Sequence, residues 1–211
     1  MTHSWWSVRV ELLGGGQAGE LWPRPGRIFA VNPRHTFHVF AEAIDDAFAR
    51  WDRSHLHEFT VPAAASPAGG DHYDDLYVTE LKYLEDYEPD RYRDADHVRL
   101  EALLGLGDEF GYVFDLGDNW RHRCVIGDGP LDPETALGIV PARPLAYWGW
   151  GYIPDPYGRL FDGDDGEAPI PAPPGDDWPW TGRPAPTVRT DHCPGQYTHT
   201  LSLPADVDDD D

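Results

Sequence analysis

Apolar and polar residues alternate near the start of the chain. In residues 5–13 every second side chain is apolar, from Trp6 to Leu12, with Ser, Arg and Glu between them. A period of two residues is typical of a strand with one buried face. Residues 27–31 predict a second, short strand, and the glycine- and proline-rich stretch 14–26 predicts an irregular connection between the two strands.

From Thr36 onward the period of the apolar residues becomes helical. Apolar side chains recur at steps of three and four residues, and acidic side chains occupy the other face. We expect Thr36 to be the N-cap, because its hydroxyl can accept a hydrogen bond from a free amide of the first turn. The pattern predicts an amphipathic helix over 37–51, ended by the polar residues after Trp51. Its apolar positions are Phe37, Phe40, Ala41, Ile44, Phe48 and Trp51.

Shorter patterns predict the next elements. Residues 55–61 predict a strand with His55, His57 and Phe59 on one face. Residues 75–84 fit either a strand or a short helix, and residues 94–107 predict a helix of one or two turns.

The sequence FDLGDNWRHRCVIG, residues 114–127, predicts a hairpin. We interpret Gly117, Asp118 and Asn119 as its turn, because these residue types tolerate a positive φ and bind their own backbone amides. Every second residue of the returning strand, at Trp120, His122 and Cys124, should then face the core. In the outgoing strand, Tyr112, Phe114 and Leu116 should share a face.

The last part of the chain has a different composition. Residues 144–161 are rich in aromatic residues, glycine and proline, which predicts an ordered but irregular segment. Residues 162–211 are rich in proline and acidic residues, which predicts a mostly extended or disordered tail, with 197–203 as a candidate edge strand. We therefore expect one α+β domain over 1–161, with a mainly antiparallel sheet of five or six strands. One long and one short helix should cover one side of that sheet.

The formal net charge of −22 limits the classes of partner. Binding to a phosphate backbone relies on lysine and arginine side chains, so direct nucleic-acid binding is disfavoured and a protein partner, with a basic surface as one option, is expected. Two cysteines are too few for a disulfide framework, and the first residues do not form a secretion signal. We expect a cytoplasmic protein without a membrane span.

Several of these motifs together resemble the plasmid pRiA4b ORF-3-like family. They are a helix ending in Trp51, the strand HLHEF at 55–59, and the hairpin with Tyr112, Asp115 and His122. The resemblance covers residues 5–127. Members are also labelled as TnpR-like passenger proteins of insertion elements, which implies a role as accessory protein of a mobile element. The family name implies no established activity.

The histidines and aspartates of this region allow two interpretations. If the 55–61 strand and the 120–126 strand share a face of one sheet, His55 or His57 could approach His122, and a buried imidazole needs a hydrogen-bond partner. One interpretation is a buried histidine network. The other is a divalent-metal or acid-base site that also includes Asp115 or Asp118.

Two other groups of residues offer binding chemistry. His192, Cys193 and His199 lie near one another in the tail and could hold a metal ion, although their spacing matches no standard zinc finger. Aromatic side chains could form a binding surface or could hold an irregular loop in place through ring packing. They are Trp148, Trp150, Tyr152 and Tyr157. We expect no bound cofactor, and the alternative is a bound divalent metal ion.

These observations leave two leading hypotheses of function. The first is a non-enzymatic protein-interaction or mobile-element accessory protein. The second is a metal- or His/Asp-dependent hydrolase or nuclease that uses a His55, His57, His122 and Asp118 cluster. The geometry discriminates between them. Convergence of His57 and His122 with a carboxylate in an open pocket favours the enzyme, and burial of the imidazoles within the sheet disfavours it.

Overall fold

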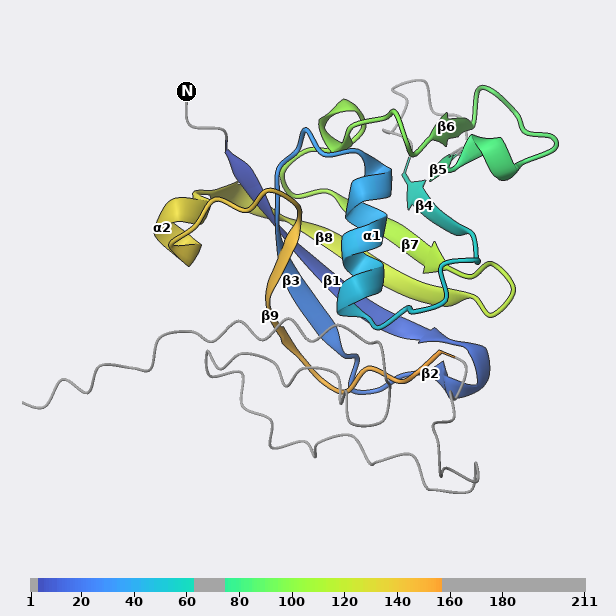
Figure 1. Ribbon diagram of the computed structural model, residues 1–211, viewed down its shortest axis with the longest axis horizontal. Coiled ribbons are helices and arrows are strands. Elements are labelled where there is room, and N and C mark those ends of the chain that lie inside the picture. The colour runs from blue at the N-terminus through green and yellow to red at the C-terminus, as the bar shows by residue number, and fades with distance from the viewer. Residues whose placement is uncertain (1–3, 63–74, 157–211) are drawn as a thin grey trace, which may run out of the picture.

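A sheet of nine strands with one helix across its face forms the body of the protein (Figure 1). This computed structural model describes residues 4–62 and 75–156. The strand order is β6-β5-β4-β7-β8-β1-β3-β9, and the short β2 pairs with β1. All pairs are antiparallel except β5 with β6. The described residues therefore form the expected single α+β domain with a mainly antiparallel sheet.

The centre of the sheet is the strand predicted first. β1 (Trp5–Gly15) alternates buried and partly exposed side chains, and it lies between β3 (Gly26–Val31) and β8 (Trp120–Leu131). The buried side chains of β1, which include Val8, Val10 and Leu12, belong to the hydrophobic core. The strand prediction for 5–13 and that for 27–31 are thus confirmed.

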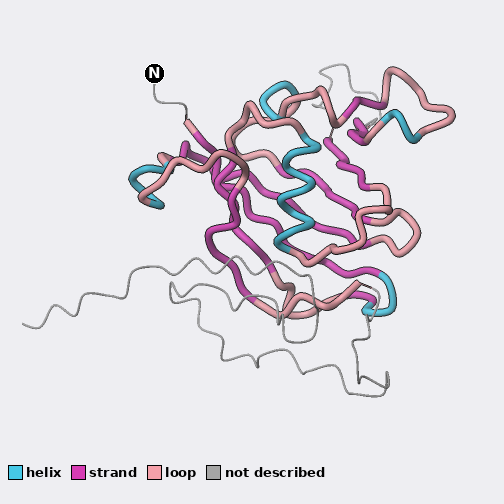
Figure 2. The backbone as a smooth tube through the Cα atoms, viewed as in Figure 1, coloured by secondary structure: helices cyan, strands magenta, loops and turns pink. Residues whose placement is uncertain are grey.

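Helix α1 (Phe37–Ala47) covers one face of the sheet (Figure 2). Its N-cap is Thr36, whose hydroxyl accepts a hydrogen bond of 3.3 Å from the backbone N–H of Val39, as predicted. The predicted apolar side chains are buried from Phe37 to Phe48. The predicted end at Trp51 is wrong, because the helix stops at Ala47.

The early end of α1 has a specific backbone cause. Ala49 has φ of 56°, its N–H donates to the carbonyl of Asp46, and the N–H of Arg50 donates to the carbonyl of Asp45. This pair of bonds is the Schellman motif, which usually has glycine in the left-handed position. An alanine there gives no sequence signal, so the pattern of apolar residues suggested a longer helix.

One end of the sheet is built from short strands. β4 (His57–Val61) pairs with β7 (Glu109–Phe114) and with β5 (Leu76–Thr79), and β6 (Tyr92–Asp94) is the edge strand. For residues 75–84 the sequence allowed a strand or a short helix, and the structure contains a strand, β5, followed by a 3-10 turn, Leu81–Tyr83. The helix predicted within 94–107 is a single 3-10 turn, Leu100–Ala102.

The β7–β8 hairpin is confirmed, but its turn chemistry differs from the prediction. In this hairpin the non-glycine residues with positive φ are Asp115 and Asn119, and Asp115 Oδ1 accepts the backbone N–H groups of Gly117 and Asp118. Asp115 therefore has the local role that we assigned to Asp118. Leu116 lies beyond the end of β7 and is exposed, so the prediction that it shares a strand face with Tyr112 and Phe114 is wrong.

The aromatic segment after residue 144 contains a strand that the sequence did not reveal. β9 (Leu145–Trp150) pairs with β3, and the Trp150 ring covers Gly26, where a Cβ atom would lie 2.3 Å from the ring. The strand count exceeds five or six because three strands were not predicted: β9, and the very short β6 and β2 (Gly19–Glu20). A short helix, α2 (Pro133–Leu137), and a 3-10 turn, Gly16–Ala18, were not predicted.

No helix in the described parts of the chain is long and apolar enough to cross a membrane. The predicted tail 162–211, its candidate strand 197–203 and the domain boundary at 161 lie outside the described residues.

Candidate functional site: a histidine cleft between α1 and β4

A cleft with a volume of about 510 Å³ opens along α1, from His38 in its first turn to Asp46 near its end. Its wall comprises α1, the chain that enters β4, the residues that follow β5, and Arg143. Its charged and polar lining residues are His38, Glu42, Asp45, Asp46, Arg53, Ser54, His55, His57, Glu80, Tyr83 and Arg143. The cleft thus collects imidazoles, carboxylates and guanidinium groups from elements that are far apart in the sequence.

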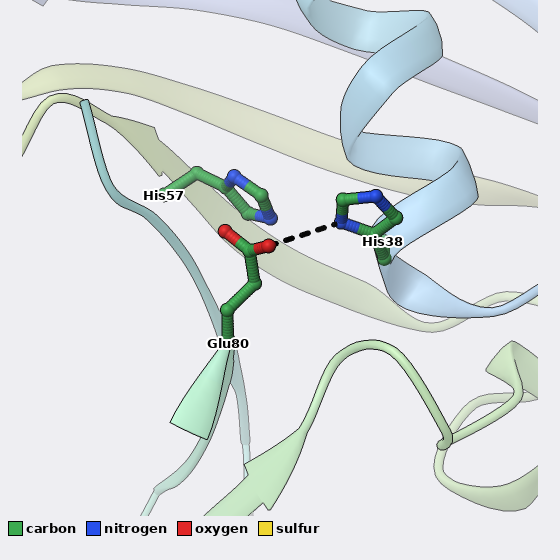
Figure 3. Close-up of side chains that lie close together, drawn as sticks. All are labelled: His38, His57 and Glu80. Atoms are coloured by element: carbon green, nitrogen blue, oxygen red, sulfur yellow. Dashed lines mark ion pairs between the residues drawn. The ribbon is translucent and has the colours of Figure 1, made fainter. Parts of the chain in front are cut away.

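Two imidazoles and one carboxylate point toward one another inside this cleft (Figure 3). His38 comes from the first turn of α1, His57 is the first residue of β4, and Glu80 directly follows β5. One ligand atom from each of the three lies within 4.8 Å of those of the others. We call these three residues the ligand set.

His57 is the most deeply placed imidazole of the ligand set. Its residue surface is 6% exposed, and its Nε2 is buried with no hydrogen-bond partner among the described residues. Burial lowers the pKa of His57 to about 4, with Glu80 opposing this effect and His38 reinforcing it. His57 is therefore neutral at pH 7 and presents a buried nitrogen without a partner.

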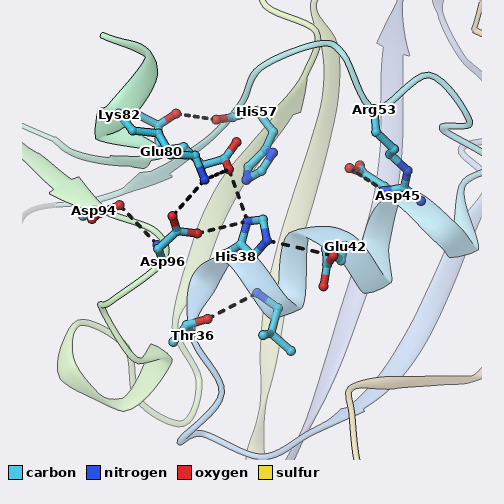
Figure 4. A network of polar contacts seen from close by, with 12 residues as sticks. Thr36, His38, Glu42, Asp45, Arg53, His57, Glu80, Lys82, Asp94 and Asp96 are labelled. Atoms are coloured by element: carbon cyan, nitrogen blue, oxygen red, sulfur yellow. Dashed lines mark hydrogen bonds and ion pairs between the residues drawn. The ribbon is translucent and has the colours of Figure 1, made fainter.

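His38 lies between the acidic groups of the cleft (Figure 4). Its Nδ1 is 3.5 Å from Asp96 Oδ1 and 3.7 Å from Glu80 Oε1, and its Nε2 is 3.9 Å from Glu42 Oε1. Lys82 Nζ is 3.0 Å from both Glu80 Oε1 and Asp96 Oδ2. Three carboxylates thus surround His38, and two of them, Glu80 and Asp96, share the ammonium group of Lys82.

A buried carboxylate lines the part of the cleft nearest Arg53. Asp45 is 3% exposed, accepts a hydrogen bond of 2.6 Å from the Tyr112 hydroxyl, and lies 2.9 Å from Arg53 Nη1. Burial raises the pKa of Asp45 to about 7, although Arg53 and Tyr112 oppose the rise. Asp45 therefore changes its charge near neutral pH.

His122 is separate from the cleft. It is 2% exposed, its Nδ1 is 3.3 Å from the carbonyl oxygen of Tyr112, and its ring packs edge-on against Phe48. Burial lowers the pKa of His122 well below its ordinary value. The Tyr112 ring contacts both histidines, with centroid distances of 5.3 Å to His122 and 6.0 Å to His57. His122 is a core residue of the sheet and does not line the cleft.

A family model for plasmid pRiA4b ORF-3-like proteins matches residues 9–136, more than half of the chain. This chain belongs to the plasmid pRiA4b ORF-3-like family. The match includes His38, His57, Glu80, Lys82 and Asp96.

The fold of this pRiA4b ORF-3-like chain is similar to that in a crystal structure of a protein of unknown function from Methanosarcina mazei Go1. The TM-score is 0.50 and the identity is 20%, and the similarity covers 71% of each chain. This likeness shows the fold alone. No curated protein matches the sequence.

The predicted cluster of His55, His57, His122 and Asp118 is not assembled in the pRiA4b ORF-3-like fold. His57 lies in the cleft, His122 is in the core, and Asp118 lies in the exposed hairpin turn. His55 precedes β4, so it does not share the strand face with His57 as predicted. It does meet one predicted partner, since His55 Nδ1 is 3.2 Å from Asp115 Oδ2.

The aromatic candidates of the pRiA4b ORF-3-like chain are largely part of its sheet edge. Trp150 is buried, and its Nε1–H donates to the carbonyl of Arg24 at 2.7 Å. Trp148 and Tyr152 are partly buried, and the rings of Trp148 and Trp150 pack 5.8 Å apart. Tyr157 lies outside the described residues, as do the tail candidates His192, Cys193 and His199.

Sequence reasoning missed two members of the ligand set, His38 and Glu80. They come from a helix and from the end of a strand, with His57 between them in the sequence, so no short spacing connects the three. One signal was present. His38 lies next to the apolar stripe of α1, at a position that the helical pattern of apolar residues does not require to be polar or apolar.

Proposed function

We propose that this protein binds a divalent first-row transition-metal ion, with zinc as the reference ion, through His38, His57 and Glu80. The observation that carries the proposal is the Nε2 atom of His57, a buried nitrogen without a hydrogen-bond partner that faces a second imidazole and a carboxylate. Buried polar atoms are nearly always hydrogen-bonded, and an exception calls for a specific reason. At His57 a metal ion supplies that reason, because two other ligand groups lie beside it, whereas the Nε2 of His122 is also unpartnered but belongs to no such group among the described residues.

The chemistry of the ligand set fits such an ion. Imidazole nitrogen and carboxylate oxygen are ordinary ligands of zinc, and two histidines with one carboxylate also suit other first-row metals. Tetrahedral bonds of about 2.0–2.1 Å hold ligand atoms about 3.4 Å apart, so the set must contract from the present 4.8 Å limit. His38 is the least buried of the three, so its side chain has the most freedom to move toward the other ligand atoms.

The electrostatics of the cleft also support a cation. A histidine binds a metal only when its ring nitrogen is deprotonated, and the low pKa of His57 meets this condition at pH 7. Glu80 and Asp96 add negative charge next to His38. A divalent ion therefore enters a site where one imidazole is neutral and carboxylates are close.

We favour binding over hydrolysis as the role of this ion. The hydrolase hypothesis relied on His122 and Asp118 as partners of His57, and both lie outside the cleft. We further propose that the protein acts in the cytoplasm with a protein partner, as an accessory factor of the mobile elements that the family resemblance implies. The net charge of −22 favours a protein partner over nucleic acid.

Calorimetric titration of zinc into the full chain, after treatment with a chelator, tests the proposal. We expect one ion bound in the cleft with a dissociation constant in the micromolar range or below, and loss of that ion in His57→Leu. His122→Leu is the matched control, because it also replaces a buried imidazole but leaves the cleft intact, and it should bind zinc normally. Unchanged binding in His57→Leu would place the metal elsewhere, with His192, Cys193 and His199 as the next candidates, and would refute the proposal.

A further inference from the structure

The positive charge beside the ligand set comes from Lys82, a residue type that occurs once in the sequence. The chain contains sixteen basic residues, and Lys82 is the single lysine among them, the other fifteen being arginines. It lies in the 3-10 turn after β5, two residues beyond Glu80. A lysine ammonium is a compact point charge on a flexible stem, whereas a guanidinium is a broad plane, so the two are not interchangeable between closely spaced carboxylates.

Lys82 bridges the two carboxylates that approach His38. Its Nζ is 3.0 Å from Glu80 Oε1 and 3.0 Å from Asp96 Oδ2 (Figure 4). The other oxygen of Asp96 is 3.5 Å from His38 Nδ1. Glu80 and Asp96 therefore face the same small volume, where their mutual repulsion is offset by the ammonium group of Lys82.

We propose that Lys82 is an internal cation that competes with the metal, and that a bound divalent ion displaces it from Glu80 and takes Asp96 as a fourth protein ligand. This inference rests on the proposed metal binding at His38, His57 and Glu80. It adds one ligand to the site and gives the site a built-in competitor.

Three observations indicate that a bound metal ion displaces Lys82 from Glu80 and does not bind while Lys82 stays in place. Glu80 Oε1, the oxygen nearest both His38 and Lys82, cannot bind a metal at full strength while it also accepts from an ammonium group. The Lys82 side chain is 52% exposed, so it can swing into water without unpacking the core. Asp96 loses its main counter-charge when Lys82 leaves, and a divalent ion beside His38 replaces that charge.

The fourth ligand also bears on the role of the site. Structural and regulatory zinc sites are closed by four protein ligands, whereas catalytic sites keep one position for water. A site of His38, His57, Glu80 and Asp96 belongs to the first class. The inference thus extends the proposal that the ion is bound by a non-enzymatic protein.

Zinc affinities of four proteins test the inference by competition with a chromophoric chelator. Lys82→Met should bind zinc about tenfold more tightly than the wild type, because a positive charge near the ion is removed, and water screens this charge since the Lys82 side chain is half exposed. In the Lys82→Met background, Asp96→Asn should weaken binding at least tenfold. Glu85→Gln in the same background is the matched control, since it removes a carboxylate from the same loop outside the cleft, and it should have little effect.

The single lysine also provides a direct readout. Reductive methylation with ¹³C-formaldehyde labels the Lys82 amine, which keeps its charge, and the N-terminal amine. Zinc should shift the Lys82 methyl resonance in the wild type and leave it unchanged in His57→Leu.

The outcomes separate this inference from the proposal on which it rests. An unchanged affinity in Lys82→Met, or no loss on adding Asp96→Asn to it, overturns the inference even if zinc binds through His57. Absence of zinc binding in both the wild type and Lys82→Met overturns the proposed function as well.

Discussion

Replacing His57 by leucine should stabilise the fold while it abolishes metal binding. Most substitutions of a residue that is only 6% exposed destabilise a protein, so a predicted gain in stability for His57→Leu is unusual. It follows from the buried Nε2 atom, which has lost its hydrogen bonds to water and has gained no partner among the described residues. Leucine has a similar volume and has no polar atom to desolvate.

The magnitude follows from two opposing effects. A buried polar group without a hydrogen bond costs about 1–3 kcal/mol of stability. A hydrophobic replacement of similar volume but different shape costs up to about 1.5 kcal/mol through imperfect packing, here against Phe59 and Tyr112, whose rings lie 6.4 Å and 6.0 Å from the imidazole. The difference predicts a gain of about 1 kcal/mol for His57→Leu.

Equilibrium unfolding in urea at pH 7, with a chelator present, measures this gain. The midpoint should move to higher urea with an unchanged slope, because the change affects stability and not the area exposed on unfolding. Phe59→Leu is a suitable comparison, since Phe59 is fully buried in the same strand and its truncation should cost about 1–2 kcal/mol.

A loss of 1 kcal/mol or more in His57→Leu would refute the reasoning. That result would mean that His57 has a structural partner in the folded protein, and that its imidazole is retained for the fold and not for a ligand. Repeating the titration with zinc completes the test, because the wild type should then gain stability by mass action and the variant should not.

Three further predictions concern the residues around the cleft and the sheet edge. Asp45→Asn should gain stability relative to the wild type as the pH rises from about 4 to about 7, by up to about 4 kcal/mol. The reason is that the pKa of Asp45 is raised to about 7 in the fold, so the folded wild type holds this proton more tightly than the unfolded chain and loses stability when the proton leaves. Urea unfolding at pH 4.5 and pH 8 measures the difference between the two proteins, and a difference that does not change with pH would contradict the prediction. Gly26→Ala should lower stability by about 2 kcal/mol through collision with the Trp150 ring, whereas Gly129→Ala, with open space around its Cβ position, should be close to neutral in thermal unfolding. Asp115→Ala should lower the free energy of unfolding by about 1–2 kcal/mol, because it removes the side-chain acceptor of the hairpin turn at a residue with positive φ. Asp115→Asn keeps an acceptor oxygen and should retain most of the stability. Equal losses in the two variants would show that the turn does not depend on this acceptor.

The parts of the fold that the sequence predicted are those where burial alone determines the pattern. Trp120 and Cys124 alternate with arginines, so the strand and its buried face could be predicted without knowledge of its neighbours. β9 could not be predicted, because its glycine at 149 weakens the strand signal and its stability depends on pairing with β3. The end of α1 was missed for a related reason, since Ala49 adopts a backbone conformation that glycine usually marks.

The candidate site shows a similar limit. The sequence singled out His57 but paired it with His122, which would require the two side chains to meet across the sheet. The register instead pairs His57 with Phe114 and pairs Tyr112 with His122, so the strand β7 separates the histidines. The residues that do meet His57 come from α1 and from the end of β5, and their approach depends on how the helix packs on the sheet.

Crystals of the full chain grown or soaked with zinc provide the most direct test of the central claim. Diffraction data recorded above and below the zinc absorption edge should show one anomalous peak in the cleft, about 2.0–2.2 Å from His57 Nε2 and from ligand atoms of His38 and Glu80. A structure in which the cleft has no peak at saturating zinc, or in which zinc binds only to other residues, would contradict the account.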